Sequence, residues 1–148
     1  YAIKEIEASI KELKISGYTI LQGGNRVNNV FEPTILEGDF NNPLNGKKEI
    51  FGPVATLSKI KTLEEGIVGS NDSPYGLHAG IFTNNIDVAF KAVNELQCGG
   101  VMVNDSSDYR IDMMPFGGVK QSGIGREGVA SAIKEMTSTK IICFNLKN

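Results

Sequence analysis

The sequence predicts an α/β fold in which strands and helices alternate around a largely parallel sheet. Segments with apolar residues at helical spacing follow short apolar strand patterns along most of the chain. Glycine or asparagine stands at most of the junctions, where helices end and loops begin. The 148 residues suffice for one domain with its own core, and no internal repeat, low-complexity tract or interdomain linker interrupts them.

An amphipathic helix is predicted at the start of the chain. Its apolar residues recur at helical spacing, at Ile3, Ile6, Ile10 and Leu13. Gly17 ends the pattern, as glycine often does just past a helix. Because the pattern begins at the first residues and no initiator methionine precedes it, we expect the chain to begin inside a domain.

Three strands are expected in the first half of the chain. Residues 18–21 form the first, which a pair of glycines stops, and residues 31–36 form the second. Residues 38–46 are polar and predict a loop. Residues 54–60 then alternate apolar and polar positions, as a half-buried strand does.

Two helices and a strand follow. Glu64 and Glu65 follow Thr62 at the second and third positions. Acidic residues in a first helical turn predict a helix with Thr62 as its N-cap. A short strand is expected at residues 81–83, before a helix capped by Asn84 or Asn85. The glycine pair at residues 99–100 ends that helix.

The last part of the chain contains the longest loop. A strand at residues 101–103 leads into residues 104–120, a loop length that is typical of functional segments. A helix is expected at residues 127–137 and a final apolar strand at residues 141–146. Little sequence follows this strand to cover its edges, so we expect it to pair with another chain.

Composition and charge argue against several classes of function. The net charge is −2 without a basic stripe, so nucleic acid is not an expected partner. No apolar run reaches membrane-spanning length, and no signal-peptide pattern opens the chain. The two cysteines fit a reducing cytoplasm better than a disulfide-stapled secreted scaffold. His78 is the single histidine and has no partner pattern around it, so no metal site is predicted.

Residues 49–54, Glu-Ile-Phe-Gly-Pro-Val, have residue types that suit a nucleotide. The carboxylate of Glu49 can accept hydrogen bonds from both hydroxyls of a ribose. Two residues on, the ring of Phe51 can lie against a flat nicotinamide, and Gly52 lets the backbone pass close to a ligand. The alternative is an exposed acid, a core phenylalanine and a Gly-Pro turn, and the residue types alone favour this alternative.

This segment and residues 115–127, Pro-Phe-Gly-Gly-Val-Lys-Gln-Ser-Gly-Ile-Gly-Arg-Glu, together resemble the C-terminal part of an aldehyde dehydrogenase. Two more segments match that family, the Tyr-Gly-Leu at residues 75–77 and the Gly-x-x-x-Asn at residues 100–104. The resemblance implies that residues 1–140 are the C-terminal part of the catalytic domain and that residues 141–148 are an oligomerisation strand and tail. It also implies a homo-oligomer, either a dimer or a tetramer.

The resemblance assigns a cofactor role to the first segment. By position, Glu49 would hold the nicotinamide ribose of NAD or NADP and Phe51 would pack on the cofactor. The family usually has a second acid before the ribose glutamate, where this chain has Lys48. The adenine half would bind a Rossmann-type domain that is not in this chain, so the sequence does not distinguish NAD from NADP.

The resemblance places the catalytic cysteine and the water-activating glutamate upstream of this chain, so no catalytic residue is expected within it. Cys98 lies at the C-terminus of a predicted helix, where the helix dipole would raise the pKa of its thiol. Cys143 lies in the apolar final strand. We therefore expect both to be buried or bystander thiols.

The resemblance assigns a substrate role to the long loop. Residues 105–114 would form a wall of the tunnel by which the aldehyde enters, and Phe116 would line the pocket beside the reacting cysteine. The planar guanidinium of Arg110 suits a carboxylate, phosphate or sulfonate, which favours a small aldehyde with an anionic or hydroxylated tail. Alternatively, Arg110 pairs with Asp108 or Asp112 on the surface.

Residues 123–128 match the G-x-G-x-x-G pattern of dinucleotide-binding folds but lack its context. That fingerprint needs a strand directly before it and an acid about twenty residues later. A long loop precedes the glycines here, so we interpret them as a tight passage from loop to helix.

The complete enzyme would oxidise a small aldehyde to its acid with NAD or NADP, through a thiohemiacetal on the upstream cysteine. This chain alone is expected to be inactive. Two alternatives remain: a non-catalytic fragment that self-associates, and a relative that makes an acyl-CoA ester or reduces an acyl phosphate.

Overall fold

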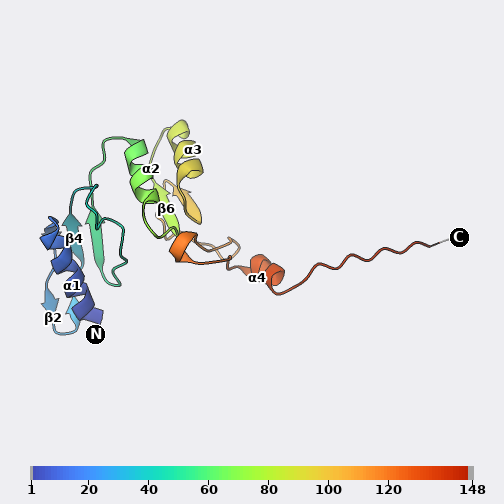
Figure 1. Ribbon diagram of the computed structural model, residues 1–148, viewed down its shortest axis with the longest axis horizontal. Helices are drawn as coiled ribbons and strands as arrows, with labels where there is room; N and C mark the ends of the chain where they lie inside the picture. Colours follow the sequence, from blue (N-terminus) through green and yellow to red (C-terminus); the bar gives the residue numbers. More distant parts are fainter. Residues whose placement is uncertain (1, 147–148) are drawn as a thin grey trace. The chain divides into compact units, whose positions relative to one another are not determined.

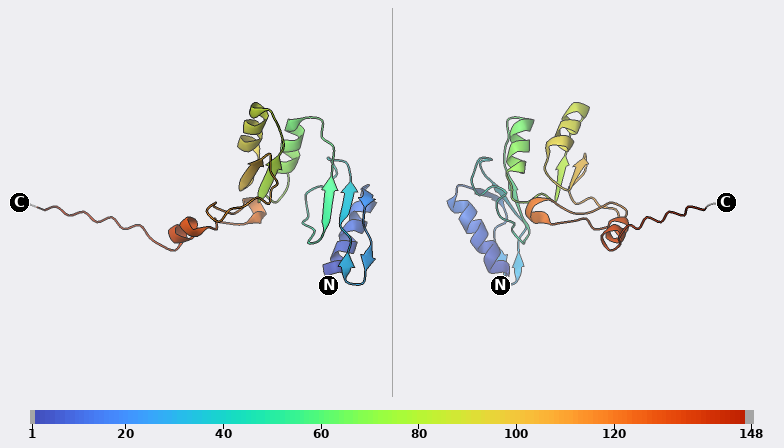
Figure 2. Two further views of the ribbon diagram at one scale, coloured as in Figure 1. Left: turned by 180° about the vertical axis from the view of Figure 1, so that it is seen from behind. Right: turned by 45° about the vertical axis from the view of Figure 1, so that its right-hand side comes forward.

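The computed structural model describes residues 2–146, and these form two compact units. The first unit comprises residues 2–74 and 85–96, and the second comprises residues 75–84 and 97–146. Helices and strands occur in both units, so the predicted α/β class is confirmed. Figures 1 and 2 show the elements of each unit in three views.

The first unit is built on a mixed sheet of three strands. The strand order is β1 (Thr19–Gln22), β4 (Thr34–Glu37) and β5 (Val54–Leu57). β1 pairs antiparallel with β4, and β4 pairs parallel with β5 in the register Thr34 to Val54. The prediction of one strand over residues 31–36 is therefore wrong in detail. β3 (Val30–Phe31) instead forms a hairpin with β2 (Arg26–Val27), and β4 begins only after Pro33.

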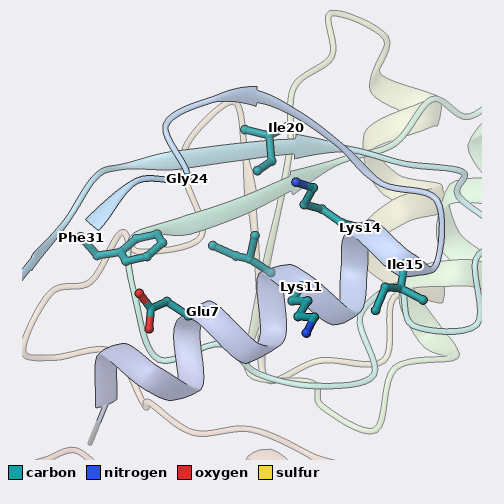
Figure 3. Close-up of a pocket in the computed structure, with 8 residues that line it drawn as sticks. Glu7, Lys11, Lys14, Ile15, Ile20, Gly24 and Phe31 are labelled. Carbon is teal, nitrogen blue, oxygen red and sulfur yellow. The ribbon is translucent and has the colours of Figure 1, made fainter. Parts of the chain in front are cut away.

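Helix α1 (Ala2–Ile15) lies against this sheet and closes the core (Figure 1). Its predicted apolar face is buried, and the core cluster comprises Ile6, Ile10, Leu13, Tyr18, Phe31 and Leu36. Beside the hairpin the helix leaves a hollow of about 400 Å³. Figure 3 shows Ile20 and Phe31 facing the helix across this hollow. The core thus depends on side chains from α1, the hairpin and the sheet.

Two capped helices complete the first unit. Thr62 caps α2 (Leu63–Asn71), and its hydroxyl accepts a hydrogen bond from the backbone N–H of Glu65. Asn85 caps α3 (Ile86–Glu95) through bonds from two backbone N–H groups. α2 and α3 pack against each other (Figure 2). The Asn71 side chain donates to the Glu95 carbonyl at 2.7 Å, which ties the C-terminal ends of the two helices together.

The second unit contains a parallel pair of strands. β6 (His78–Ile81) pairs with β7 (Gly100–Val103), with His78 opposite Gly100. The loop that follows β7 leads to a short 3-10 turn (Lys120–Ser122) and to α4 (Val129–Glu135), which is shorter than the predicted helix at residues 127–137. Phe116 and Glu127 form an isolated antiparallel bridge. The bridge joins the chain before the 3-10 turn to the chain just before α4.

The predicted final strand at residues 141–146 is not formed in the described chain. Residues 137–146 have no regular secondary structure. Their apolar side chains are exposed, at Ile141, Ile142, Phe144 and Leu146. Residues 147 and 148 of the expected oligomerisation segment lie outside the described residues, as does Tyr1 at the start of the expected catalytic part.

Replacement of a buried sheet residue should test the core of the first unit. Leu36 on β4 is 0% exposed, whereas Leu57 on β5 is 51% exposed. Leu36→Ala should lower the free energy of unfolding by about 3 kcal/mol, because it leaves a cavity. Leu57→Ala should cost less than about 1 kcal/mol. Urea unfolding followed by circular dichroism measures both, and equal losses would contradict this assignment of the core.

Candidate functional site

The loop that contains Glu49 and Phe51 is fixed at both of its ends. Ile50 packs against the core of the first unit, so its two neighbours project outward. The carbonyl of Pro53 accepts a hydrogen bond from the backbone N–H of Thr34 at 2.8 Å, where the parallel pair of β4 and β5 begins. A side chain added at Gly52 would approach Ile6 of α1 to 2.5 Å. Any larger residue at this position would therefore displace the Ile6 side chain.

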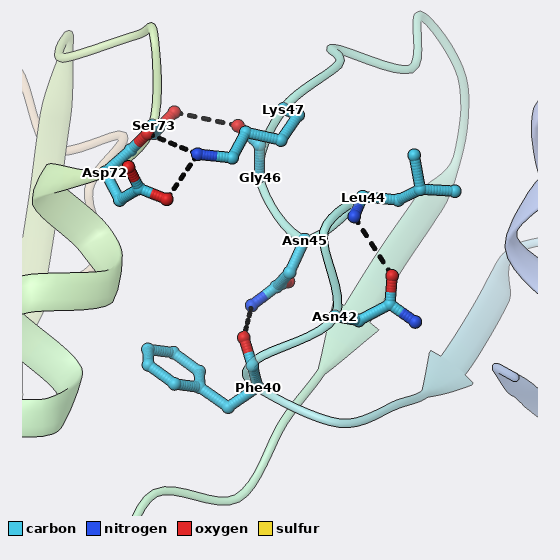
Figure 4. Close-up of polar contacts among 8 residues, drawn as sticks. All are labelled: Phe40, Asn42, Leu44, Asn45, Gly46, Lys47, Asp72 and Ser73. Carbon is cyan, nitrogen blue, oxygen red and sulfur yellow. Dashed lines mark hydrogen bonds and ion pairs between the residues drawn. The ribbon is translucent and has the colours of Figure 1, made fainter. Parts of the chain in front are cut away.

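The segment before Glu49 is held by polar contacts to α2 (Figure 4). The ammonium of Lys47 donates to the carbonyl of Asp72 at 2.6 Å and pairs with its carboxylate. The hydroxyl of Ser73 donates to the carbonyl of Gly46 at 2.8 Å. Asn45 donates to the carbonyl of Phe40 within the same loop. These bonds fix the path of the backbone that presents Glu49.

Glu49 and Phe51 both lie on the surface of the first unit. Phe51 is 80% exposed, so the alternative of a core phenylalanine is wrong. The side chain of Glu49 is exposed, and no hydrogen bond or ion pair within residues 2–146 engages its carboxylate. An acceptor and an aromatic face are thus presented two residues apart on an anchored loop.

In the second unit, Phe116 is fixed by its backbone. Its N–H donates to the carbonyl of Glu127 at 3.0 Å, and the N–H of Glu127 donates back at 2.6 Å. The ring of Phe116 is half-buried. This paired bridge holds the start of the Phe-Gly-Gly segment against the residues that lead into α4.

Arg110 lies over the ring of Phe116. Its guanidinium carbon is 4.2 Å from the ring centroid, a distance that allows a cation–π interaction. Its Nη2 is 3.4 Å from a carboxylate oxygen of Glu127. The alternative partners considered from the sequence, Asp108 and Asp112, are therefore wrong for this ion pair. The structure brings both predicted substrate residues together, on one side of the second unit.

His78 is a member of this cluster that the sequence did not identify. Its ring centroid is 5.0 Å from that of Phe116, with the ring planes at 80°. Its Nδ1 is 3.0 Å from the carbonyl oxygen of Ser107 in the long loop. No local signal pointed to these contacts, because Ser107 lies 29 positions further along the chain and Phe116 lies further still.

A hollow of about 370 Å³ lies beside Phe116 and the glycine-rich segment. Arg126 closes part of it, since its Nη1 donates to the carbonyls of Gly118 and Gly125 at 2.8 and 2.7 Å. Gly125 and Gly128 have positive φ angles of 79° and 117°, which favour glycine. These glycines fold the chain back onto the Phe-Gly-Gly segment, which supports their interpretation as a tight passage.

Neither cysteine has the surroundings of a nucleophile. Burial raises the pKa of the Cys98 thiol, which also lies 3.2 Å from the carbonyl of Gly100. The predicted direction is confirmed, but the cause differs, because α3 ends at Glu95 and burial is the main contribution. Cys143 is exposed, so of the two expected alternatives, a buried or a bystander thiol, burial does not hold for it.

Two kinds of feature are absent from residues 2–146. No group of three or more histidine, cysteine, aspartate or glutamate side chains there is arranged to hold a metal ion. None of the helices between residues 2 and 146 is both long and apolar enough to cross a membrane.

The chain belongs to the aldehyde dehydrogenase family, whose model matches residues 1–142. Among its relatives, the lactaldehyde dehydrogenase of Methanococcus maripaludis is 47% identical over 93% of this chain. The chain spans 29% of the length of that relative. It therefore corresponds to less than a third of such an enzyme.

Two solved structures resemble the chain closely. Aldehyde dehydrogenase 21 from Physcomitrella patens, in complex with the reaction product succinate, matches 94% of this chain with a TM-score of 0.87 and 43% identity. The glyceraldehyde-3-phosphate dehydrogenase GapN from Methanocaldococcus jannaschii, complexed with NADP, matches 91% with a TM-score of 0.86 and 44% identity. This chain covers 29% of each of those chains.

The raised pKa of Cys98 leads to a prediction about thiol reactivity. At pH 7.5 less of the Cys98 thiol is ionised than of an ordinary thiol, and the thiolate is the reactive form. Iodoacetamide should alkylate exposed Cys143 at least about fivefold faster than Cys98. The alkylation rate of an ordinary thiol, which has a pKa of about 8.5, levels off once the pH is well above that value. The alkylation rate of Cys98 should still rise with pH there.

Peptide mass spectrometry measures the two alkylation rates, with the urea-unfolded chain as the control in which they should converge. Faster alkylation of Cys98 than of Cys143 at neutral pH would identify an activated thiol and contradict the assignment.

Proposed function

We propose that this chain is part of an enzyme that oxidises a small anionic or hydroxylated aldehyde to its acid with NAD or NADP. The observation that carries the substrate class is the exposed guanidinium of Arg110, held over the ring of Phe116. Both residues are then substrate-binding residues, with Phe116 as an apolar wall and Arg110 as the partner of the anionic tail.

Glu49 and Phe51 fit the nicotinamide half of the cofactor. The exposed carboxylate can accept hydrogen bonds from the two hydroxyls of a ribose, and the exposed ring can cover one side of a flat heterocycle. The nicotinamide, when bound, accepts a hydride from the substrate. Glu49 orients the ribose, and Phe51 keeps water from the ring that it covers.

The covalent step belongs to the part of the enzyme upstream of this chain. We infer that a cysteine there attacks the aldehyde carbon to form a thiohemiacetal, and that water releases the acid after oxidation. Arg110 and Phe116 hold the aldehyde tail during these steps. No catalytic residue of this chain is part of the proposal, which accords with the burial of Cys98.

We also propose that the enzyme is a cytoplasmic homo-oligomer, with residues 141–148 as its pairing segment. The exposed apolar side chains at residues 141–146 support this role, because a partner strand would cover them. They equally favour a second candidate, a fragment that self-associates through this segment without turnover.

Loss of Arg110 should change substrate preference in the complete enzyme. Arg110→Ala should lower kcat/KM for succinate semialdehyde or glyceraldehyde 3-phosphate by about 10- to 100-fold, because the anionic tail loses a charge-assisted partner. Lactaldehyde, which has an uncharged hydroxyl, should lose less than about fivefold. Absorbance of NADH or NADPH gives the rates, and Arg26→Ala, on an exposed residue of the hairpin, is the matched control.

Three outcomes of this assay would count against the proposal. Equal losses with all three aldehydes would contradict an anion-binding role for Arg110. A requirement for coenzyme A or phosphate would favour an acyl-transferring relative. Turnover by the 148-residue chain alone would contradict the upstream position of the nucleophile.

Removal of the Glu49 charge should weaken cofactor binding. Glu49→Gln should raise the KM for the cofactor by about tenfold, because neutral acceptors bind ribose hydroxyls less strongly than a carboxylate does. The KM for the aldehyde should change little. Glu12→Gln on the exposed side of α1 removes the same charge and should leave both constants unchanged. An unchanged cofactor KM in Glu49→Gln would exclude the ribose contact.

A further inference from the structure

We propose that His78 is a positioning residue that sets aldehyde selectivity by holding Phe116 and the Arg110 loop together. The proposal rests on the substrate roles proposed above for Phe116 and Arg110. His78 begins β6, a strand that otherwise serves only as scaffold for this region. Three contacts of its imidazole carry the argument.

The first contact is with the neighbouring strand. His78 lies opposite Gly100 in the parallel register of β6 and β7. A side chain built at Gly100 would come within 3.0 Å of Cδ2 and 3.1 Å of Nε2 of the imidazole. The missing side chain at Gly100 therefore provides the space in which the imidazole lies, and the strand pair fixes the position of the ring.

The second contact is with Phe116. The two rings are nearly perpendicular, at 80°, and their centroids are 5.0 Å apart, an arrangement that aromatic pairs favour. The backbone of Phe116 is already held by its two hydrogen bonds to Glu127. His78 adds a constraint on the ring itself and limits its rotation.

The third contact is with the long loop. A carbonyl oxygen can only accept, so Nδ1 of His78 carries the proton and donates to Ser107 at 3.0 Å. Ser107 lies three residues before Arg110 in the chain. The imidazole thus links β6 to the loop that presents the guanidinium.

These contacts place one imidazole in the support of both substrate residues. Phe116 contacts His78 and also lies beneath the guanidinium of Arg110. Loss of the imidazole frees the phenyl ring to rotate and releases the loop at Ser107, so Arg110 loses its fixed position over the ring. The anionic tail of the substrate is then bound less firmly, whereas the reaction at the aldehyde carbon is unaffected.

The test compares three His78 variants in the complete enzyme. His78→Ala should lower the ratio of kcat/KM for succinate semialdehyde to that for propionaldehyde by about tenfold, mainly through KM. His78→Asn keeps a donor for Ser107, and His78→Phe keeps a ring for Phe116. Each should restore part of the ratio. Ile81→Val, on the same strand, is the matched control and should leave the ratio unchanged.

Several outcomes would overturn the role of His78. A loss of the same factor for both aldehydes in His78→Ala would show a purely structural residue. If Arg110→Ala itself leaves the ratio unchanged, the proposed function fails. If Arg110→Ala collapses the ratio while His78→Ala preserves it, only the positioning role fails.

A second variant keeps the test decisive if His78→Ala does not fold. Gly100→Ala retains the imidazole but presses on it from the opposite strand, since the added methyl group would lie 3.0 Å from the ring, which must shift by a few tenths of an ångström. It should lower the same selectivity ratio. An unchanged ratio in folded Gly100→Ala would contradict the proposal.

Discussion

The first unit depends on the hydrogen bonds of one buried residue, Thr34. Its backbone N–H donates to Pro53 at 2.8 Å, which joins β4 to the end of the loop that presents Glu49 and Phe51. Its hydroxyl accepts from Gly24 at 2.9 Å and donates to Glu32 at 2.8 Å, on either side of the hairpin. Each of these groups would otherwise be buried without a partner. Hydrogen bonds thus connect the buried sheet directly to the loop of Glu49 and Phe51.

The second unit uses a different means to fix its site. Its two short strands bury little apolar surface, with Met102 as their buried residue. Order comes instead from contacts between distant segments, such as the Phe116–Glu127 bridge and the bonds of Arg126 to two carbonyls. A loop held in this way can vary in sequence while its two ends stay fixed. This property suits the substrate-binding role that we propose for the loop.

Local signals in the sequence were enough for the α/β class, for the burial of the α1 face and for the cap at Thr62, and they narrowed the cap of α3 to Asn84 or Asn85. Each depends on residues close together in the chain. The break between β3 and β4 was missed although its signals are local, since β3 pairs with β2 three to five positions earlier and Pro33 separates β3 from β4. The Arg110 pair with Glu127 was missed because Glu127 lies seventeen positions away. The predicted strand at residues 141–146 is not assigned as a strand in the described chain.

The lack of a side chain at Gly100 has a consequence for how this family can diverge. The space opposite that position is occupied by the imidazole of His78, so the two positions share one fixed volume. A methyl group at Gly100 would press on the imidazole, and the ring would have to shift by a few tenths of an ångström. Substitutions at these two sites should therefore be coupled, because the space open to one side chain depends on the size of the other.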